Sequence, residues 1–238
     1  MHRFFADIEK NEVHLTEVDA FHLLGVLRVE QNEHIEVVFN DELFECVVTR
    51  LVPLKIEVLN RIQNVHETPV KITLFMCLTK SDKPETVIER AVELGVEEIV
   101  IVASDRSIVK WNEDQIANRL LRYHRISQSA AAQSKRLTIP EITYLPFKSI
   151  FNYKQYNYFF IGDANDKAEK VNNSFPNFRK GEQIAILIGP EGGFSQREME
   201  KAVENELIPI TFSTNVLRAE VAAVTSVGII NYLSLQLK

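Results

Sequence analysis

The pattern of apolar residues predicts two consecutive domains, a small β-barrel followed by an α/β domain with a parallel sheet. Residues 1–62 contain short apolar runs and turns around one helix, which is typical of an antiparallel meander. From Val70 onward, strand-like and helix-like stretches alternate, and this alternation favours a parallel sheet covered by helices. The uncharged residues 184–188 fit a strand that is buried on both faces of such a sheet.

The first predicted domain comprises residues 1–66. Its expected strands are residues 3–6, 13–15, 34–39, 43–51 and 54–62. Thr16 and Asp19 resemble a capping box, so we expect them to open a helix that ends near Leu27. The polar stretch that ends at Pro69 is the expected linker.

The second predicted domain comprises residues 70–238. Its expected strands are residues 70–78, 98–102, 142–145, 158–161, 184–188 and 208–212. We expect four helices: one from Ser81 or Asp82 that stops at Gly95, one over residues 113–134 capped by Asn112, one from Ser195 and one from about Ala219.

The segment IAILIGPEGGFSQRE combines a strand, a glycine-rich loop and a helix start. Gly189, Gly192 and Gly193 allow sharp turns and bring the backbone close to a ligand, because glycine tolerates positive φ and has no Cβ. Ser195 and Glu198 form a predicted capping box. Since α/β proteins bind small molecules at the carboxyl ends of strands, we predict a ligand site here. An ordinary strand-to-helix turn is the alternative, and the spacing matches neither a dinucleotide-binding loop nor a P-loop.

Composition predicts a soluble globular protein, with 45% apolar and 25% charged residues. Cys46 and Cys77 lie in apolar runs, and no Cys/His cluster could hold zinc, so we expect no metal and a reducing, cytoplasmic setting. The N-terminus is charged and lacks the pattern of a signal peptide. Residues 221–237 carry no charge, but polar residues interrupt them. We expect a helix buried in the protein or in a subunit interface, and no membrane segment.

Charge is unevenly distributed along the chain. Residues 1–68 hold 6 Lys/Arg and 13 Asp/Glu, a net charge of −7, whereas residues 69–238 are close to neutral. The overall charge of −6 argues against indiscriminate nucleic-acid binding. Residues 104–136 have a local excess of four positive charges, which indicates either a phosphate-contacting face or a solvated helix face.

Four segments together resemble the bacterial enzymes that methylate uridine at N3 in 16S ribosomal RNA, within the SPOUT methyltransferase superfamily. They are LTKSDKPETVIERAVELGVEEI, then SDRSIVKW with AAAQSKRLTIPEI, then IGPEGGFSQRE, then FSTNVLRAEVAAVTSV. The N-terminal HLLGVLRVEQNEHIEVVF also resembles the PUA-like barrel of that family, so the likeness covers nearly the whole chain. The resemblance implies a C-terminal α/β domain with a deep trefoil knot, a homodimer with the last helix in its interface, and S-adenosylmethionine (SAM) as cofactor.

The resemblance also implies the residues that hold SAM, largely through backbone groups. They are Leu187, Ile188, Gly189, Pro190, Glu191, Gly192, Gly193, Phe212, Ser213, Asn215, Val216, Leu217 and Arg218. The sequence departs from the family pattern at Ser213 and Asn215, where the family has glycine and arginine, and at Val221, where it has threonine.

Methylation of a uracil N3 requires removal of its proton and stabilisation of the resulting anion. Glu191 and Glu220 are the carboxylates closest to the predicted cofactor loops, and Arg218 would stabilise the anion. Each residue also has a structural interpretation: Glu191 as a loop carboxylate, Glu220 as a first-turn acid favoured by the helix dipole, and Arg218 as a salt-bridge partner.

Residues that match other family motifs, or that lie in the barrel, are candidates for contacts with 16S rRNA or the 30S subunit. They are Arg3, His22, Arg28, Lys80, Lys83, Arg106, Gln133 and Arg136. Alternatively, Lys83 is a solvated charge beside a helix start, and His22 is a packed helix residue. Trp111 has a packing role by default.

The sequence therefore predicts a SAM-dependent uridine-N3 methyltransferase that acts on small-subunit ribosomal RNA. One alternative is a SPOUT enzyme that methylates a different base or a ribose 2′-hydroxyl, since the fold serves several targets. The other is a catalytically silent RNA-binding assembly factor, which the departures at Ser213 and Asn215 favour.

Overall fold

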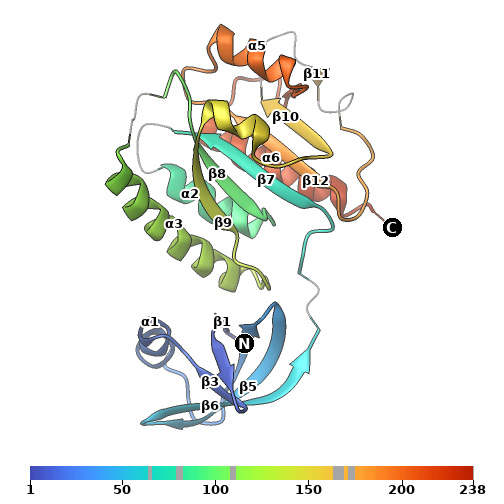
Figure 1. Ribbon diagram of the computed structural model, residues 1–238. Helices are drawn as coiled ribbons and strands as arrows, with labels where there is room; N and C mark the ends of the chain where they lie inside the picture. Colours follow the sequence, from blue (N-terminus) through green and yellow to red (C-terminus); the bar gives the residue numbers. More distant parts are fainter. Residues whose placement is uncertain (64–65, 79–82, 108–110, 163–168, 171–174, 238) are drawn as a thin grey trace. The chain divides into compact units, whose positions relative to one another are not determined.

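The computed structural model describes residues 1–238 except 64–65, 79–82, 108–110, 163–168, 171–174 and 238 (Figure 1). The chain divides into two compact units, Met1–Glu67 with Ala131–Ile139, and Thr68–Ala130 with Pro140–Lys238. The division differs from the predicted boundary at residues 131–139, which belong to the first unit. Among the described helices, none is both long enough and apolar enough to cross a membrane.

The first unit is built on a six-stranded sheet. Its strands are β1 (Arg3–Phe5), β2 (Asp7–Glu9), β3 (Glu12–His14), β4 (His34–Phe39), β5 (Glu42–Leu51) and β6 (Leu54–Ile62), in the order β1-β4-β5-β6-β3-β2. All neighbours are antiparallel except β1 and β4. Alternate side chains point to one face of a strand, and those of Ile35, Val37, Cys46, Val48 and Ile56 form the core of the unit.

The helix of the first unit begins as predicted and then widens. Thr16 caps α1 (Glu17–Phe21) by accepting a hydrogen bond from the Asp19 N–H at 3.1 Å. The chain continues directly into a π-helical turn, η1 (His22–Val26), in which the Leu27 N–H donates to the His22 carbonyl. Leu23 is fully buried in the core, so η1 anchors the helix on the sheet.

The second unit contains the predicted parallel sheet. Its strands are β7 (Lys71–Cys77), β8 (Glu98–Ala103), β9 (Glu141–Pro146), β10 (Tyr158–Gly162), β11 (Glu169–Lys170), β12 (Gln183–Ile188) and β13 (Ile208–Thr211). Their order is β11-β13-β10-β12-β7-β8-β9, and all neighbours are parallel. β12 lies inside the sheet between β10 and β7, which explains why its residues are apolar on both faces.

Within the described residues, four helices and one short 3-10 helix accompany this sheet. They are α2 (Lys83–Glu93), α3 (Glu113–Gln133), η2 (Phe147–Asn152), α5 (Gln196–Glu204) and α6 (Ala219–Ser234). Asn112 caps α3, because its Oδ1 accepts from the Gln115 N–H at 2.9 Å. Gly95 ends α2 with a φ of 89°, as predicted. The predicted caps at Ser81 and Asp82 lie outside the described residues.

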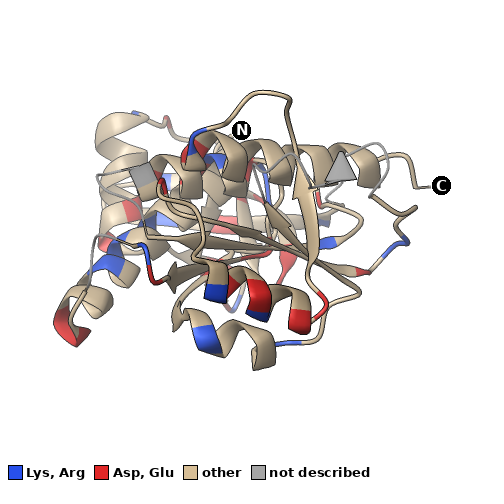
Figure 2. Cartoon of the chain, turned by 90° about the horizontal axis from the view of Figure 1, so that it is seen from above, with Lys and Arg blue, Asp and Glu red and all other residues tan. Residues whose placement is uncertain are grey.

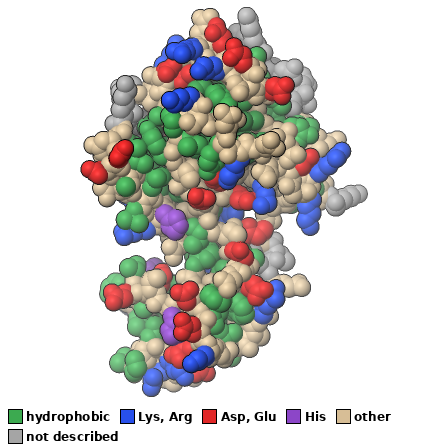
Figure 3. Space-filling view, viewed as in Figure 1, with side chains coloured by type: hydrophobic (Ala, Val, Ile, Leu, Met, Phe, Trp, Pro, Cys, Tyr) green, Lys and Arg blue, Asp and Glu red, His purple; other side chains and the backbone are tan. Residues whose placement is uncertain are grey.

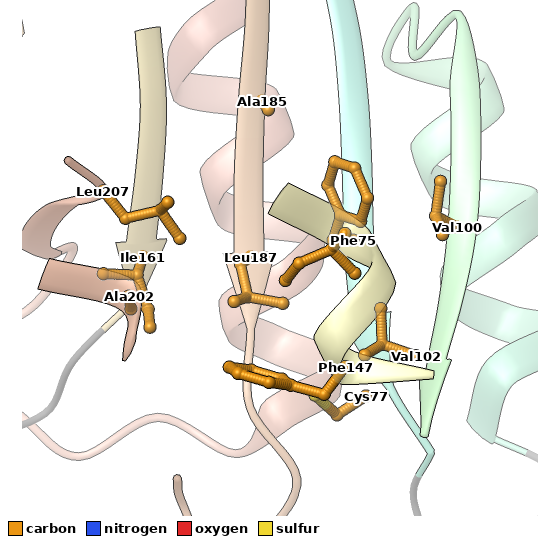
Figure 4. Packing of buried hydrophobic residues seen from close by; sticks show 11 residues of the cluster. Phe75, Cys77, Val100, Val102, Phe147, Ile161, Ala185, Leu187, Ala202 and Leu207 are labelled. Atoms are coloured by element: carbon orange, nitrogen blue, oxygen red, sulfur yellow. The ribbon is translucent and has the colours of Figure 1, made fainter. Parts of the chain in front are cut away.

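The core of the second unit lies on both faces of the sheet. On one face, side chains of β7, β8 and β12 gather around Phe147 of η2, and Ala202 of α5 lies beside Ile161 of β10 (Figure 4). On the other face, α6 packs against β7, β12 and α2. The two covered faces leave the carboxyl ends of the central strands as the place where loops of different elements meet.

Candidate active site

The loops that follow β12 and β13 line one cavity of about 590 Å³. β13, β10 and β12 are adjacent and parallel, so their carboxyl ends meet at the same edge of the sheet. The glycine loop, residues 189–194, forms one wall, and the second loop, residues 212–218, forms another. A volume in this range is typical of pockets for small molecules and cofactors.

The three glycines of the glycine loop are present for different reasons. Gly193 has a φ of 67°, in the left-handed region that favours glycine. A Cβ at Gly189 would lie 3.0 Å from the ring of Phe194. A Cβ at Gly192 would meet only Arg106, at an ordinary distance of 3.7 Å. The fold therefore has room for a side chain at Gly192, where the backbone faces the cavity.

The end of the glycine loop is fixed by the predicted capping box of α5. Glu198 N–H donates to Ser195 Oγ at 3.2 Å, and Ser195 N–H donates to Glu198 Oε2 at 2.8 Å. The other carboxylate oxygen of Glu198 accepts from the N–H of Asp105, in the loop after β8, at 2.8 Å. In the same loop, Arg106 Nη1 donates to the Gly192 carbonyl at 2.9 Å.

The second loop is organised by its own polar side chains. Ser213 Oγ accepts from the Asn215 N–H at 3.0 Å, and Thr211 Oγ1 donates to the Ser213 carbonyl at 3.0 Å. Ser213 thus stabilises the turn at one of the positions where the sequence departs from the pattern that it resembles. Arg218 follows in an extended conformation, is exposed, and sits immediately before the first turn of α6.

Nearly all the predicted cofactor residues line the cavity. The exception is Leu187, which is fully buried in the core of the sheet, because successive strand residues point to opposite faces. The cavity is also lined by residues that the sequence did not single out, including Gly162, Phe194, Met199 and Ala222. The sequence signal for Gly162 is its place directly after the predicted strand 158–161. The structure adds that a Cβ there would lie only 2.9 Å from Ile188 Cδ1.

The three predicted catalytic residues fall in two places. Glu191 and Arg218 line the large cavity. Glu220 is half-buried and lines a second, small cavity of about 10 Å³ with Met76 and Cys77. That space is enough for about one water molecule. Ile188 and Gly189 border both cavities, so Glu220 lies behind the glycine loop rather than among the residues that line the large cavity.

Comparisons with known proteins place the chain in a family. The RNA methyltransferase domain family matches residues 66–231. Ribosomal RNA small subunit methyltransferase E of Mesomycoplasma hyopneumoniae is 31% identical over 227 residues, which cover 94% of this chain and 96% of that protein. This chain belongs to the ribosomal RNA small subunit methyltransferase E family. The family member called ribosomal RNA small subunit methyltransferase E 2 from Borreliella burgdorferi is 28% identical over 87% of this chain and 85% of its own length.

A solved structure of the family has the same fold. The ribosomal RNA small subunit methyltransferase E of Neisseria gonorrhoeae, bound to S-adenosylmethionine, is 27% identical. It covers 98% of both chains with a TM-score of 0.87. A methyltransferase of Legionella pneumophila, at 24% identity and a TM-score of 0.88, supports the fold alone. The predicted α/β class with a parallel sheet is thereby confirmed.

For a ribosomal RNA methyltransferase, the surface cations are of interest, and the predicted RNA residues differ in exposure. Arg106 is exposed and lines the cavity, and Gln133 is exposed at the end of α3. His22 and Arg28 are exposed in the first unit. Lys83 opens α2, but its side chain is not described, and Lys80 lies outside the described residues.

Two of the predicted RNA residues, Arg3 and Arg136, are buried. Arg3 Nε pairs with Glu36 Oε2 at 2.9 Å, and Arg3 Nη1 donates to the carbonyls of Lys135 and Arg136. Arg136 Nη2 pairs with Glu67 Oε2 at 3.5 Å. Both guanidinium groups thus hold parts of the first unit together, and a phosphate would have to displace these contacts.

Some basic side chains of the stretch 104–136 form contacts within the protein. Arg119 lies over the ring of Trp111 at 4.8 Å, and Arg122 pairs with Glu85 at 2.7 Å. Trp111 also packs against Tyr123 and Tyr144, which fits its predicted packing role. Lys and Arg lie interspersed with Asp and Glu along the chain (Figure 2). Both signs also occur together at the end of the second unit where Figure 1 draws α5 (Figure 3).

The cysteines and acids of the described residues offer no metal site. No group of three or more His, Cys, Asp or Glu side chains within them is arranged to hold a metal ion. Burial raises the pKa of the Cys77 thiol well above its usual value, and the nearby Glu198 carboxylate adds to the rise. Cys77 is therefore a packed thiol under the glycine loop rather than a nucleophile.

Proposed function

We propose that the protein is a SAM-dependent methyltransferase that methylates N3 of a uridine in 16S ribosomal RNA of the small subunit. The observation that carries this proposal is that both predicted cofactor loops line the same cavity of about 590 Å³. Membership of the family and the SAM-bound relative from Neisseria gonorrhoeae support the same assignment.

The residues present fit SAM. The cavity walls are rich in glycine and backbone groups, and Gly192 lies on the wall beside the side chain of Arg106. When bound, SAM supplies an electrophilic methyl group. The backbone donors and acceptors of residues 188–193 and 212–218 would hold the cofactor, and the apolar side chains of Phe194 and Met199 would exclude water from it.

Three charged residues have separate proposed roles in removing the N3 proton and stabilising the resulting anion. Arg218 stands at the start of α6 on the cavity wall, where its guanidinium stabilises the anion that forms as N3 loses its proton. Glu191 is the carboxylate on the cavity wall and is the proposed acceptor of that proton. Glu220 lies behind the glycine loop, so we assign it a positioning role.

RNA is contacted by the exposed members of the predicted set. These are Arg106 at the cavity, Gln133 at the end of α3, and His22 and Arg28 in the first unit. Lys80 and Lys83, whose side chains lie outside the described part of the chain, remain in the proposed set on the family motif alone. Arg3 and Arg136 are left out of this surface because their side chains are buried and hydrogen-bonded. The substrate is 16S rRNA or the 30S subunit.

The finer architecture is also part of the proposal. Residues 1–66 form a PUA-like RNA-binding barrel, and residues 70–238 form a SPOUT domain with a trefoil knot. Support for the knot comes from the chain path: β13 pairs with β10, and α6 then returns to β7 and β12. The working form is a cytoplasmic homodimer joined through α6, on which Val221 and Tyr232 are exposed.

Two measurements on the purified protein test the function. Calorimetric titration with SAM should show binding, and incubation with 30S subunits or 16S rRNA followed by nucleoside mass spectrometry should show 3-methyluridine. Absence of SAM binding would favour the silent assembly factor. SAM binding with a methyl group on another base or on a ribose would favour the SPOUT enzyme with a different target.

A further inference from the structure

Glu198 is a buried carboxylate that joins two segments far apart in the sequence. Glu198 is only 2% exposed. Both oxygens of its carboxylate accept hydrogen bonds from backbone N–H groups. Oε2 accepts from Ser195 N–H and Oε1 from Asp105 N–H, each at 2.8 Å. A buried charge is tolerated only when it is hydrogen-bonded in this way, because desolvation is otherwise very unfavourable.

The contact to Asp105 exceeds what a helix cap requires. A capping box needs one oxygen of its Glu to reach back to the N-cap N–H. Here the second oxygen binds the loop after β8, and Ser195 Oγ also donates to Asp105 Oδ2 at 3.0 Å. Ser195, Glu198 and Asp105 therefore form a closed set of hydrogen bonds between the start of α5 and the end of β8.

The same β8 loop holds the glycine loop at a second point. Arg106 Nη1 donates to the Gly192 carbonyl at 2.9 Å, three residues before Ser195. Gly193, with its left-handed φ, lies between the two attachments. A loop that is fixed at both ends loses less conformational freedom when a ligand binds than a mobile loop does. The protein therefore binds the ligand more tightly.

We propose that Glu198 is a positioning residue of the cofactor site, which holds residues 192–195 in the conformation that binds SAM by tying them to the loop after β8. This inference rests on the proposed function, since it takes SAM as the ligand. It adds that the loop after β8 and the glycine loop bind the cofactor as one unit, although neither Glu198 nor Asp105 lines the cavity.

The test compares Glu198→Gln with Glu200→Gln. Glutamine keeps the shape of Glu198 but replaces one acceptor oxygen with a donor, so one of the two backbone N–H groups loses its partner. Glu200 is exposed on the same helix, where its carboxylate accepts from Gln196 Nε2. We expect Glu198→Gln to raise the Kd and the KM for SAM about 10-fold or more with a smaller change in kcat, and Glu200→Gln to leave both at the wild-type level.

Hydrogen exchange gives a readout that needs no SAM. In Glu198→Gln the amides of residues 192–195 and 105 should exchange faster, while those of β12 keep the wild-type rate. If Glu198→Gln does not fold, Ser195→Ala replaces it, because it keeps both Glu198 oxygens and removes the two bonds of Ser195 Oγ, one to Asp105 Oδ2 and one from Glu198 N–H. In that variant the same amides should exchange faster, and SAM binding should weaken by a smaller factor.

The outcomes separate this inference from the proposed function. If the wild type binds no SAM, the proposed function fails, and faster exchange in Glu198→Gln would still show that the carboxylate holds the loop. If the wild type binds SAM and Glu198→Gln lowers only the melting temperature, with SAM affinity and loop exchange equal to Glu200→Gln, Glu198 is only a helix cap and the inference is overturned.

Discussion

At the scale of single residues, Gly192 separates the requirements of the fold from those of the ligand. The left-handed φ of Gly193 favours glycine, and a Cβ at Gly189 would press on the Phe194 ring, whereas a Cβ at Gly192 would meet only ordinary contacts. The reason for glycine at this position is therefore best sought in the ligand, whose close approach a side chain would block.

We predict that Gly192→Val abolishes SAM binding and leaves the melting temperature close to the wild-type value. Gly25→Ala is the matched control, because a Cβ there also meets only ordinary contacts, at 3.5 Å, in the other unit. Calorimetric titration and thermal unfolding measure the two effects. An unchanged SAM affinity in folded Gly192→Val would remove the glycine loop from the cofactor site.

For Arg218 the prediction concerns rate rather than binding. Removing one preorganised donor to a developing anion lowers the rate by about 10²- to 10³-fold, so Arg218→Ala should lower kcat by that order with little change in SAM affinity. Arg218→Lys should not restore the rate fully, because an ammonium group cannot reproduce the geometry of the guanidinium. Single-turnover methylation of 30S subunits, with SAM affinity measured beside it, checks both variants. A loss confined to SAM affinity would reassign Arg218 to cofactor binding.

At the scale of elements, the Glu36 side chain on β4 forms ion pairs with Arg3 on β1 and with Lys135. Its Oε2 accepts from Arg3 Nε and Lys135 Nζ, both at 2.9 Å. Burial alone would raise the pKa of Glu36, but the hydrogen bonds from Lys135 and Arg3 outweigh it and hold the pKa below its usual value of 4.5. A carboxyl with a lowered pKa in the folded state stabilises the fold above the unfolded-state pKa.

This contribution should therefore be complete above pH 4.5 and be lost as the pH falls through the lower pKa of folded Glu36. In Glu36→Gln, the acid-induced loss of protection of the β4 amides should be smaller than in the wild type. Glu42→Gln is the control, since Glu42 forms an exposed pair with Arg61 at the edge of the same strand pair. The measurement is the protection of the amides of residues 34–39 against hydrogen exchange between pH 3 and 6. If protection falls equally with pH in all three proteins, Glu36 does not make this contribution.

At the scale of the whole molecule, α6 is the element through which we propose two copies associate. Its exposed apolar residues include Tyr232, which is 65% exposed, and Leu235 at its C-terminal cap has the same exposure. Apart from Glu220 in its first turn, α6 carries no charged residue, and exposed apolar surface on such a helix is typical of an interface between subunits. Burying these side chains in a second copy would remove that surface from water.

We predict that the wild type sediments as a dimer at micromolar concentration and that Tyr232→Glu sediments as a monomer. A buried charge without a partner at an interface is strongly unfavourable, whereas the same change on an open surface has a small effect on stability. Val203→Glu on α5 is the control, because Val203 is 60% exposed and lies on a different helix. Dimers in all three proteins would place the interface elsewhere, and a monomeric wild type would end the proposal.

The sequence by itself determined the features whose causes lie within a few residues. The bounds of β4 and β6 agree with the apolar alternation, and the starts of α1, α3 and α5 coincide with the side chains that cap them. Helix caps depend on hydrogen bonds between residues close in the sequence, and periodicity depends on which face of one element is apolar. Both can therefore be recognised from the sequence without knowledge of the fold. The glycine loop was found for the same reason.

Only the tertiary structure decided how these elements use their side chains. It buried Arg3 and Arg136, placed Glu220 behind the glycine loop, and joined Glu198 to Asp105, 93 residues away. Burial and hydrogen-bond partners depend on segments that the chain brings together from distant positions, and the same residue types are compatible with either a solvated or a buried role. Strand order also placed Gly162 and the two loops around one cavity, because the parallel strands β13, β10 and β12 end at the same edge of the sheet.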